Sequence, residues 1–479
     1  MIIGLNKNTS QYITYNKNAV TELRYDKGTI LLNGDFHTPY AVFDPRINRY
    51  RALGIHYPEI IDYFKRNKID YVDRVRNYII PLNRNQFKET YELRDYQKEA
   101  WKRWIIHGMK GCIILPTGAG KTIIALHAIL KTNASTLVIV PTLNLMEQWF
   151  GALENILKVR NQIGKLGGGH EDIKSITITT YDSAYLKSSY LGNKFEFLIF
   201  DEVHHLASDK YSLIGEQFIS PYRLGLTATI EREDGKHVNI YRLVGKIAYS
   251  KDFYELSQDN HLSKFRLKKI KVEMLPDEIL QYKRRIFQYN QLLKEAKIFY
   301  PIRLERLIML SGNNSNLRKA LLLRNEAVDI ALNSYAKIVE LEKILKHHAI
   351  EKTIIFTVHT KLAYIISDRF LVPVITHRTK NEERNEILEK FKKGLYRVIV
   401  TTKVLDEGTD VPDANVGIIL SGTGSKREFV QRLGRLLRPK KDVENMANLI
   451  EIISSDTSEI FTSNRRNKGI NNKKQLIDK

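Results

Sequence analysis

The stretch CIILPTGAGKT, residues 112–122, places an apolar run directly before a glycine-containing loop and a Lys-Thr pair. The run has the composition of a buried strand, and Lys121 and Thr122 begin a segment that predicts a helix. Similar apolar runs, STLVIVP, SITITT and FEFLIF, follow at intervals filled by helical stretches. Strands that alternate with helices indicate a parallel sheet, so this part of the chain is expected to fold as an α/β domain.

The same alternation occurs a second time along the 479 residues. It returns from residue 352 with KTIIFT, YRVIVTT and ANVGIIL, after a long charged helical stretch. The N-terminal residues contain short strand-like runs, turns and an amphipathic segment, which indicate a small α+β domain. We therefore expect an N-terminal domain over 1–85, a first α/β domain over 86–250, a second over 251–455 with a helical insertion at 278–328, and a basic tail over 456–479.

Composition limits the kinds of binding partner and the cellular compartment that suit this chain. The net charge of +22 and the pI near 9.6 favour binding to a polyanion such as nucleic acid. Cys112 is the one cysteine of the sequence, which argues against a disulfide framework and a cysteine-based zinc site and fits an intracellular, cytoplasmic setting. The N-terminal residues do not resemble a signal peptide, and no run of about 18 apolar residues predicts a membrane span.

The loop between strand and helix predicts a nucleotide site. Its backbone amides and the start of the helix form a cradle for anions. In phosphate loops of this kind, Lys121 reaches the β- and γ-phosphates and the Thr122 hydroxyl binds Mg²⁺. Leu115 occupies the position of the usual first glycine, so the match to the strict pattern is incomplete. The remaining pattern of Gly118, Gly120, Lys121 and Thr122 still favours a nucleotide site over a chance glycine turn.

The run FLIFDEVHH supplies two carboxylates at the end of another expected strand. Asp201 and Glu202 follow the apolar residues directly, at the edge where α/β sheets bind ligands. Asp201 can hold Mg²⁺, and Glu202 can orient and deprotonate the attacking water. His204 and His205 could suggest a metal site, but no cysteine or carboxylate spacing supports one. A coupling role for His204 is favoured over a metal-binding one.

The run REFVQRLGRLLRP, residues 427–439, carries several arginines on an expected helix. Helical periodicity places its apolar residues on one side and Gln431, Arg435 and Arg438 on the other. These arginines form a solvated face, or they hold a polyanion such as a triphosphate or a nucleic-acid backbone. The phosphate loop lies more than 300 residues earlier. An arginine here therefore reaches a γ-phosphate only if the two α/β blocks close on the nucleotide, which is typical of a motor and favours Arg435 and Arg438 as arginine fingers.

Taken in order, these stretches resemble a superfamily-two helicase, and within that group the XPB family in its compact archaeal form. The matching stretches are YELRDYQKEA, LPTGAGKT, VIVPTLNLMEQW, ITITTYDS, DEVHH, RLGLTATIEREDG, TIIFTVHT, VIVTTKVLDEGTDVPDANVGIILSG and QRLGRLLRP. The resemblance implies two RecA-like parallel-sheet domains, a helical thumb at the insertion and, by position alone, a damage-recognition-like domain at 1–85. It also implies ATP and Mg²⁺ as cofactors, duplex or forked DNA as substrate, a nuclease as partner protein and a nucleoid-associated location.

The resemblance also assigns roles to individual residues. Those expected at the nucleotide are Arg94, Gln97, Pro116, Thr117, Gly118, Ala119, Gly120, Lys121, Thr122, Gly408 and Asp410. Those expected to couple hydrolysis to movement are His204, Thr227, Thr229 and Gln431. Those expected at the DNA are Thr142, Thr180, Arg232, Glu233, Asp234, Arg284, Arg285, Thr357 and Thr402.

The expected activity is ATP-dependent movement along duplex DNA or its opening, in nucleotide excision repair, transcription or both. Two other motors remain as alternatives. One is an RNA helicase of the same superfamily, and the other is a duplex-DNA motor of the branch-migration or restriction-system type. A binding scaffold with an inactive ATP site is opposed by the intact set of Lys121, Asp201, Glu202, Arg435 and Arg438.

Overall fold

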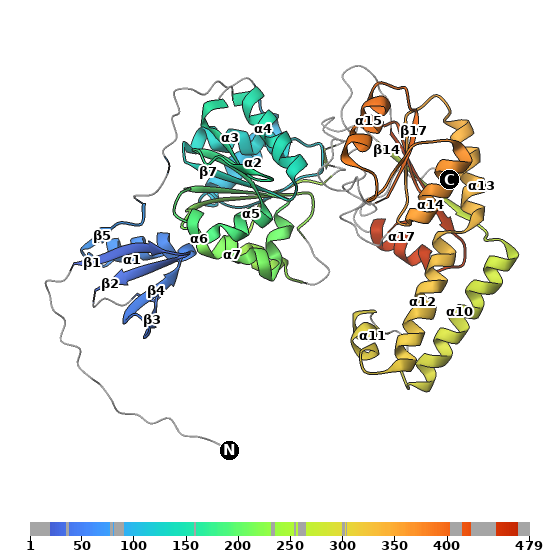
Figure 1. Cartoon of the computed structure of the whole chain (residues 1–479), viewed down its shortest axis with the longest axis horizontal. Coiled ribbons are helices and arrows are strands. Elements are labelled where there is room, and N and C mark those ends of the chain that lie inside the picture. Colours follow the sequence, from blue (N-terminus) through green and yellow to red (C-terminus); the bar gives the residue numbers. More distant parts are fainter. Residues whose placement is uncertain are drawn as a thin grey trace. The chain divides into compact units, whose positions relative to one another are not determined.

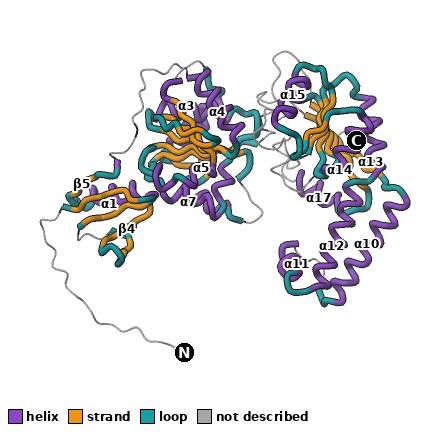
Figure 2. Tube along the Cα trace, viewed as in Figure 1, coloured by secondary structure: helices purple, strands orange, loops and turns teal. Residues whose placement is uncertain are grey.

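The computed structural model describes residues 20–34, 38–76, 80, 91–157, 160–230, 235–252, 255–256, 265–298, 302, 304–402, 414–422 and 447–467. The chain divides into two compact units, Met1–Ile114 with Thr122–Ser250 and Leu115–Lys121 with Lys251–Lys479. Figure 2 shows each unit built around strands with helices on the outside. Among the described helices, none is both long and apolar enough to cross a membrane.

The N-terminal part of the first unit is a small α+β domain (Figure 1). Its sheet has the order β3-β4-β2-β1-β5. The turn at Lys27 and Gly28 has positive φ at both residues, 47° and 92°, the turn geometry that suits a two-residue hairpin. Its elements are β1 (Thr21–Asp26), β2 (Thr29–Asn33), β3 (Val42–Asp44), β4 (Arg49–Leu53), the 3-10 helix η1 (Gly54–His56), α1 (Tyr57–Arg66) and β5 (Tyr71–Asp73).

The α1 helix is amphipathic and closes the core of this domain. Ile60 and Phe64, one helical turn apart, are fully buried together with Leu23, Ile30 and Leu32 from the first hairpin. The four-residue spacing places both helix residues on the same face, which explains the burial pattern.

The rest of the first unit is an α/β domain with an eight-stranded sheet of order β13-β6-β12-β11-β7-β10-β8-β9. Its strands are β6 (Lys110–Ile114), β7 (Thr136–Val140), β8 (Ile163–Gly167), β9 (His170–Glu171), β10 (Ile176–Thr180), β11 (Phe197–Asp201), β12 (Tyr222–Thr227) and β13 (Ile247–Ser250). Its helices are α2 (Asp95–Ile106), α3 (Lys121–Thr132), α4 (Leu143–Leu157), η4 (Arg160–Gln162), α5 (Tyr181–Leu186), α6 (Ser188–Leu191), η5 (Val203–Ala207), α7 (Asp209–Gln217) and α8 (His237–Leu243).

Strand order explains which helices cover each face. The strands pair in parallel, except β8 with β9. The chain moves along the sheet in one direction from β6 through β7 to β8 and β9, and then returns through β10, β11, β12 and β13. Because parallel crossovers are right-handed, the two directions place their helices on opposite faces. Figure 1 shows α3 and α4 on one face and α5, α6 and α7 on the other.

The N-terminal domain packs on the turn that precedes β12. Ile219 from this turn is buried in the core of the N-terminal domain. The Tyr25 hydroxyl donates to the Gln217 carbonyl oxygen at 3.2 Å, and a Cβ on Gly192 would lie 1.8 Å from that hydroxyl oxygen. This turn precedes the amino end of β12, so the N-terminal domain lies at the sheet edge opposite the carboxyl ends of the strands.

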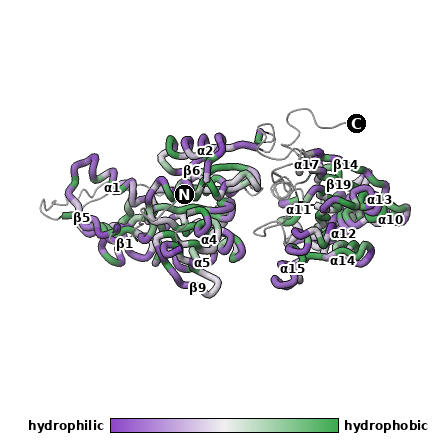
Figure 3. Tube along the Cα trace, turned by 90° about the horizontal axis from the view of Figure 1, so that it is seen from above, coloured by the Kyte–Doolittle hydropathy of each residue, from purple (hydrophilic) through white to green (hydrophobic). Residues whose placement is uncertain are grey.

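The second unit contains a parallel six-stranded sheet of order β14-β19-β18-β15-β17-β16. Its strands are β14 (Phe265–Val272), β15 (Thr353–Phe356), β16 (Val374–Ile375), β17 (Val398–Thr401), β18 (Val416–Ile419) and β19 (Ala447–Ser454). Its helices are α10 (Pro276–Glu295), α11 (Leu304–Ser311), α12 (Ser315–Leu332), α13 (Tyr335–His347), α14 (Thr360–Phe370), α15 (Asn381–Lys392) and α17 (Glu459–Asn467). Figure 3 shows α15 mainly in the hydrophilic colour, as its sequence NEERNEILEKFK requires.

The helical insertion consists of α10, α11 and α12, which extend from the sheet in Figure 1. Tyr289, Leu293, Leu307, Leu317 and Ala320 form its own small apolar core. Its last helix does not stop at residue 328, because α12 continues to Leu332, where Ala331 accepts a hydrogen bond from Ser454 at the end of β19.

The end of the second unit differs from the expected tail. The sequence assigns residues from 456 onward to a basic tail, but Glu459–Asn467 form α17, which packs on β19. Glu459 is buried and ion-paired with Lys337, at 2.7 Å. Ser463 is buried and donates to Glu451 at 2.8 Å. Glu459 thus finds its partner 122 residues earlier, and Ser463 is held by neighbouring β19, so the domain extends at least to α17.

Candidate nucleotide-binding site

Three strand ends define the candidate site. Strand β12 pairs in parallel with β6 on one side and with β11 on the other, and Leu226 is in register with both Ile113 and Asp201. Their carboxyl ends therefore meet at the same edge of the sheet. The loop 115–121 continues from β6, and Asp201 ends β11. The polar residues that the sequence singled out thus follow adjacent strands.

The loop after β6 has the backbone that an anion cradle requires. Gly118 and Gly120 have φ of 84° and 74°, a region that favours glycine. The Lys121 ammonium donates to the Leu115 carbonyl oxygen at 3.1 Å, so it lies folded over the loop. Within the described structure, the buried Thr117 hydroxyl has no hydrogen-bond partner. A polar atom buried in this way fits a site that a polar ligand completes.

The Asp201 carboxylate is held from two directions. The Trp149 indole N–H donates to Oδ2 at 2.8 Å, and the Glu202 backbone N–H donates to Oδ1 at 3.0 Å. The Tyr181 hydroxyl donates to the Asp201 carbonyl oxygen at 3.1 Å. Burial, together with the charge of Asp201, raises the pKa of Tyr181 well above its usual value, so its hydroxyl remains a donor.

Glu202 adopts a backbone conformation that is unusual for its residue type. Its φ of 47° and ψ of 56° place it in the left-handed region. Such conformations are costly for a side chain with a Cβ and are concentrated at functional sites. The turn directs the chain away from the strand into η5 while leaving the Glu202 carboxylate at the strand edge.

A hydrogen-bonded group links Glu202 to the residues after β12. The Thr227 hydroxyl lies 3.2 Å from Glu202 Oε2 and 2.8 Å from the Thr229 carbonyl oxygen. The Thr229 N–H donates to that hydroxyl at 3.2 Å. His204 Nδ1 lies 3.3 Å from the Thr227 hydroxyl oxygen and 3.4 Å from Glu202 Oε2. The structure thus brings together three of the residues expected to couple hydrolysis to movement.

The two residues expected near adenine lie at the start of α2. The Arg94 backbone N–H donates to the Gln97 side-chain oxygen at 2.9 Å, which caps the helix. Gln97 is buried, with 4% of its surface exposed. Capping accounts for its carboxamide oxygen.

The threonines expected at DNA make local contacts in this structure. The Thr142 hydroxyl accepts from the Leu145 N–H at 3.3 Å, and the Thr180 hydroxyl accepts from the Ser183 N–H at 3.2 Å, so both cap the following helices. In the second unit, Thr357 and Ser421 share a hydroxyl hydrogen bond at 2.8 Å. Thr402 is buried there too.

The two thumb arginines differ in their surroundings. Arg284 is exposed on α10, whereas Arg285 pairs with Glu326 of α12 at 2.7 Å. Arg284 therefore presents its charge to solvent, and Arg285 ties two helices of the insertion together.

Eight expected site residues lie outside the described residues. They are Arg232, Glu233, Asp234, Gly408, Asp410, Gln431, Arg435 and Arg438.

The structure adds two site residues that the sequence did not single out, Trp149 and Tyr181. Both are almost fully buried and both contact Asp201. Trp149 is 52 residues from Asp201, and its position in the run LMEQWF indicates only an apolar helix face. No local pattern reveals such a pairing.

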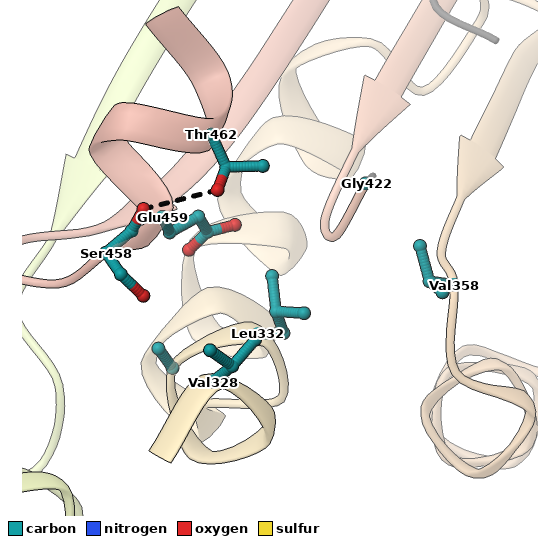
Figure 4. A pocket seen from close by; sticks show the side chains of 8 residues that line it. Val328, Leu332, Val358, Gly422, Ser458, Glu459 and Thr462 are labelled. Carbon is teal, nitrogen blue, oxygen red and sulfur yellow. Dashed lines mark hydrogen bonds between the residues drawn. The ribbon is translucent and has the colours of Figure 1, made fainter. Parts of the chain in front are cut away.

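A separate cavity of about 160 Å³ lies in the second unit (Figure 4). Figure 4 shows Val328 and Leu332 of α12 facing Glu459 and Thr462 of α17. The residues that line the cavity are Val328, Ala331, Leu332, Val358, Gly422, Ser458, Glu459 and Thr462. None of these residues is cationic, so the cavity does not suit a phosphate group.

Comparisons with known families cover most of the chain. Residues 23–75 match the xeroderma pigmentosum group B helicase damage recognition domain. Residues 90–232 match the type III restriction enzyme, res subunit, and residues 336–440 match the helicase conserved C-terminal domain. The N-terminal match falls on the five-stranded α+β domain, for which position in the sequence alone predicts a damage-recognition-like domain.

Individual proteins give the same result. The chain is 44% identical to DNA 3'-5' translocase XPB2 of Sulfurisphaera tokodaii over 454 residues, which cover 93% of this chain and 99% of that protein. It is 26% identical to the general transcription and DNA repair factor IIH helicase/translocase subunit XPB of Schizosaccharomyces pombe, covering 87% of this chain and 49% of that one. The Hef helicase domain of Pyrococcus furiosus shares the fold, with a TM-score of 0.55 at 18% identity, covering 81% of this chain and all of that domain.

Proposed function

The chain belongs to the XPB helicase family, and from this premise we propose that it is an ATP-dependent motor that moves along duplex DNA and opens it. The direction that fits its relatives is 3' to 5', which their names state for those proteins. ATP and Mg²⁺ are the cofactors of this proposal. The observation that carries it is the meeting of the phosphate loop, Asp201, Glu202 and Thr227 at the ends of three adjacent strands.

Each group at this edge has a task in phosphoryl transfer. The amides of the loop 115–121 and the Lys121 ammonium bind the phosphates. Thr122 and Asp201 would hold Mg²⁺, which neutralises charge that develops on the phosphate oxygens. Within the described structure the buried Thr117 hydroxyl has no hydrogen-bond partner, and two N–H donors hold the Asp201 carboxylate. Both observations fit a site for Mg²⁺ and phosphate.

Glu202 is the group that acts on water. Its carboxylate orients the attacking water and accepts its proton. The Thr227 hydroxyl and His204 contact the same carboxylate, so a change at Glu202 alters the segment after β12. This segment leads to Arg232, Glu233 and Asp234, the residues proposed to act at the DNA. Arg435 and Arg438 are proposed to reach the γ-phosphate from the second domain.

The cellular role follows from the substrate. A motor that opens duplex DNA would serve nucleotide excision repair, transcription or both, and the relative from Schizosaccharomyces pombe is named for transcription and DNA repair. We place the protein inside the cell and at the nucleoid, where its substrate is. Excision requires strand cleavage, and a nuclease partner would supply it.

The ATPase rate with different nucleic acids tests the proposal. The rate is measured without nucleic acid and with single-stranded DNA, duplex DNA, forked DNA, a Holliday junction and RNA, at one stated salt concentration. We expect the greatest stimulation by duplex or forked DNA. Stimulation by RNA alone would favour an RNA helicase, and stimulation by the junction alone would favour a branch-migration motor.

A further inference from the structure

We propose that Trp149 is a positioning residue for the metal-binding carboxylate of Asp201, an inference that rests on the proposed function. Trp149 lies on α4 and is 2% exposed. Its indole N–H donates to Asp201 Oδ2 at 2.8 Å, within the range of a strong hydrogen bond to a charged acceptor. It therefore connects a helix on one face of the sheet to the carboxylate at the sheet edge.

Two fixed donors determine how the carboxylate is turned. The Glu202 backbone N–H holds Oδ1 at 3.0 Å, while Trp149 holds Oδ2. Two bonds to different oxygens restrict rotation of the carboxylate about its bond to Cβ. Carboxylate oxygens have further lone pairs, so both can still accept hydrogen bonds from the water shell of a cation.

The chemistry of the donor suits a metal site. A lysine or arginine in this place would pair with the carboxylate and oppose a cation. An indole N–H carries no net charge, so it orients the carboxylate without cancelling its negative charge. Ligand carboxylates at metal sites are generally held by such outer hydrogen bonds.

A second buried tryptophan shows what a purely structural indole looks like. Trp104 of α2 is fully buried, and its N–H donates to the Arg223 carbonyl oxygen at 3.0 Å. That carbonyl lies near the start of β12, at the opposite end of the sheet from Asp201. Trp149 and Trp104 thus match in burial and hydrogen bonding and differ in the group that they hold.

The test measures how much Mg²⁺ strengthens ADP binding. Calorimetry with and without Mg²⁺ is applied to the full-length wild type, Trp149→Phe, Trp104→Phe, Asp201→Asn and the Trp149→Phe/Asp201→Asn double variant. Asp201→Asn should lose most of the gain in affinity. Trp149→Phe should lose about fivefold to tenfold of it, the scale of a single lost hydrogen bond, and Trp104→Phe should retain it.

The outcomes separate this inference from the proposed function. If Mg²⁺ does not strengthen ADP binding to the wild type, the metal site itself is wrong. If it does, but Trp149→Phe matches Trp104→Phe, only the role of Trp149 is overturned. The double variant should equal Asp201→Asn, because Trp149 acts through that carboxylate, and additive losses contradict the proposal.

A measurement on the wild type does not depend on the folding of any Trp149 variant. The sequence has three tryptophans, so replacement of Trp101 and of Trp104 assigns all three indole N–H signals in an NMR spectrum. Addition of Mg²⁺ to the ADP complex should shift the Trp149 signal and leave the Trp104 signal in place. An unmoved Trp149 signal overturns the proposal.

Discussion

Replacement of Lys337 by methionine should destabilise the second unit strongly. Lys337 and Glu459 have side chains that are 1% and 3% exposed, and the ammonium lies 2.7 Å from each carboxylate oxygen. It also donates to the Leu420 carbonyl oxygen at 2.8 Å, just after β18. Methionine removes the cation and leaves the buried Glu459 carboxylate without its ion-pair partner, which costs about 3–5 kcal/mol. That is a large part of the roughly 5–15 kcal/mol that stabilises a typical domain.

The same helix offers a matched control. Lys343 of α13 pairs with Glu340 at 2.9 Å, but its side chain is 69% exposed. Removing an exposed pair of this kind costs about 0–1 kcal/mol. Replacing both Lys337 and Glu459 by methionine should cost less than the sum of the two single changes, because neither charge is then left alone in the interior.

Hydrogen exchange followed by mass spectrometry separates the two units. Peptides that cover β15 and β18 report on the second unit, and all three tryptophans lie in the first, so their fluorescence during urea unfolding serves as an internal control. We expect faster exchange of β15 and β18 in Lys337→Met and unchanged tryptophan transitions. Equal exchange in Lys337→Met and Lys343→Met would refute the reasoning.

Four further outcomes are expected. Lys121→Ala and Glu202→Gln should nearly abolish ATP hydrolysis while Glu202→Gln still binds ATP, and wild-type turnover in either would contradict the site. Arg435→Lys and Arg438→Lys should each slow turnover by more than about tenfold with little change in DNA affinity, because a point charge does not replace a planar fork. Replacement of the exposed Lys283 and Arg284 by alanine should lower the salt slope of duplex binding by about 0.9 per lost phosphate contact, more than Arg285→Ala, since Arg285 pairs with Glu326. Burial raises the pKa of Cys112 to about 12, so its thiol should react with Ellman's reagent at pH 8 only after unfolding, and rapid native reaction would contradict its placement.

Sequence patterns predict the sheets well, because a parallel strand that is buried on both faces has a continuous apolar sequence. STLVIVP became β7, whose five residues are all buried, and FEFLIF became β11 in the same way. The fold class and the family followed from these runs and from the motifs between them.

Long-range contacts are what the sequence did not reveal. Residues 459–467 look like a polar tail, yet Glu459 is buried against Lys337, 122 residues earlier. Helix α12 continues past residue 328 to Leu332, and its last turn packs on the second domain, where Ala331 is buried and its carbonyl oxygen accepts from Ser454 at 2.7 Å. A continuous helical pattern does not show where a helix leaves one domain and enters another.

In the candidate site too, the sequence predicts the local strand pattern but not the long-range contacts. The strand-end position of Asp201 and Glu202 follows from the apolar run before them. The left-handed backbone of Glu202 and the indole of Trp149 depend on the packing of α4 and η5, which no local motif encodes.

Displacement of the third strand from a DNA triplex tests the proposed motor most directly, because only movement along the duplex removes that strand. The wild type, with ATP and Mg²⁺, should release the third strand at a rate that depends on ATP, and Glu202→Gln should bind the same DNA without releasing it. Release by Glu202→Gln at the wild-type rate, or no release by a wild type whose ATPase is stimulated by duplex DNA, would contradict ATP-driven movement along duplex DNA.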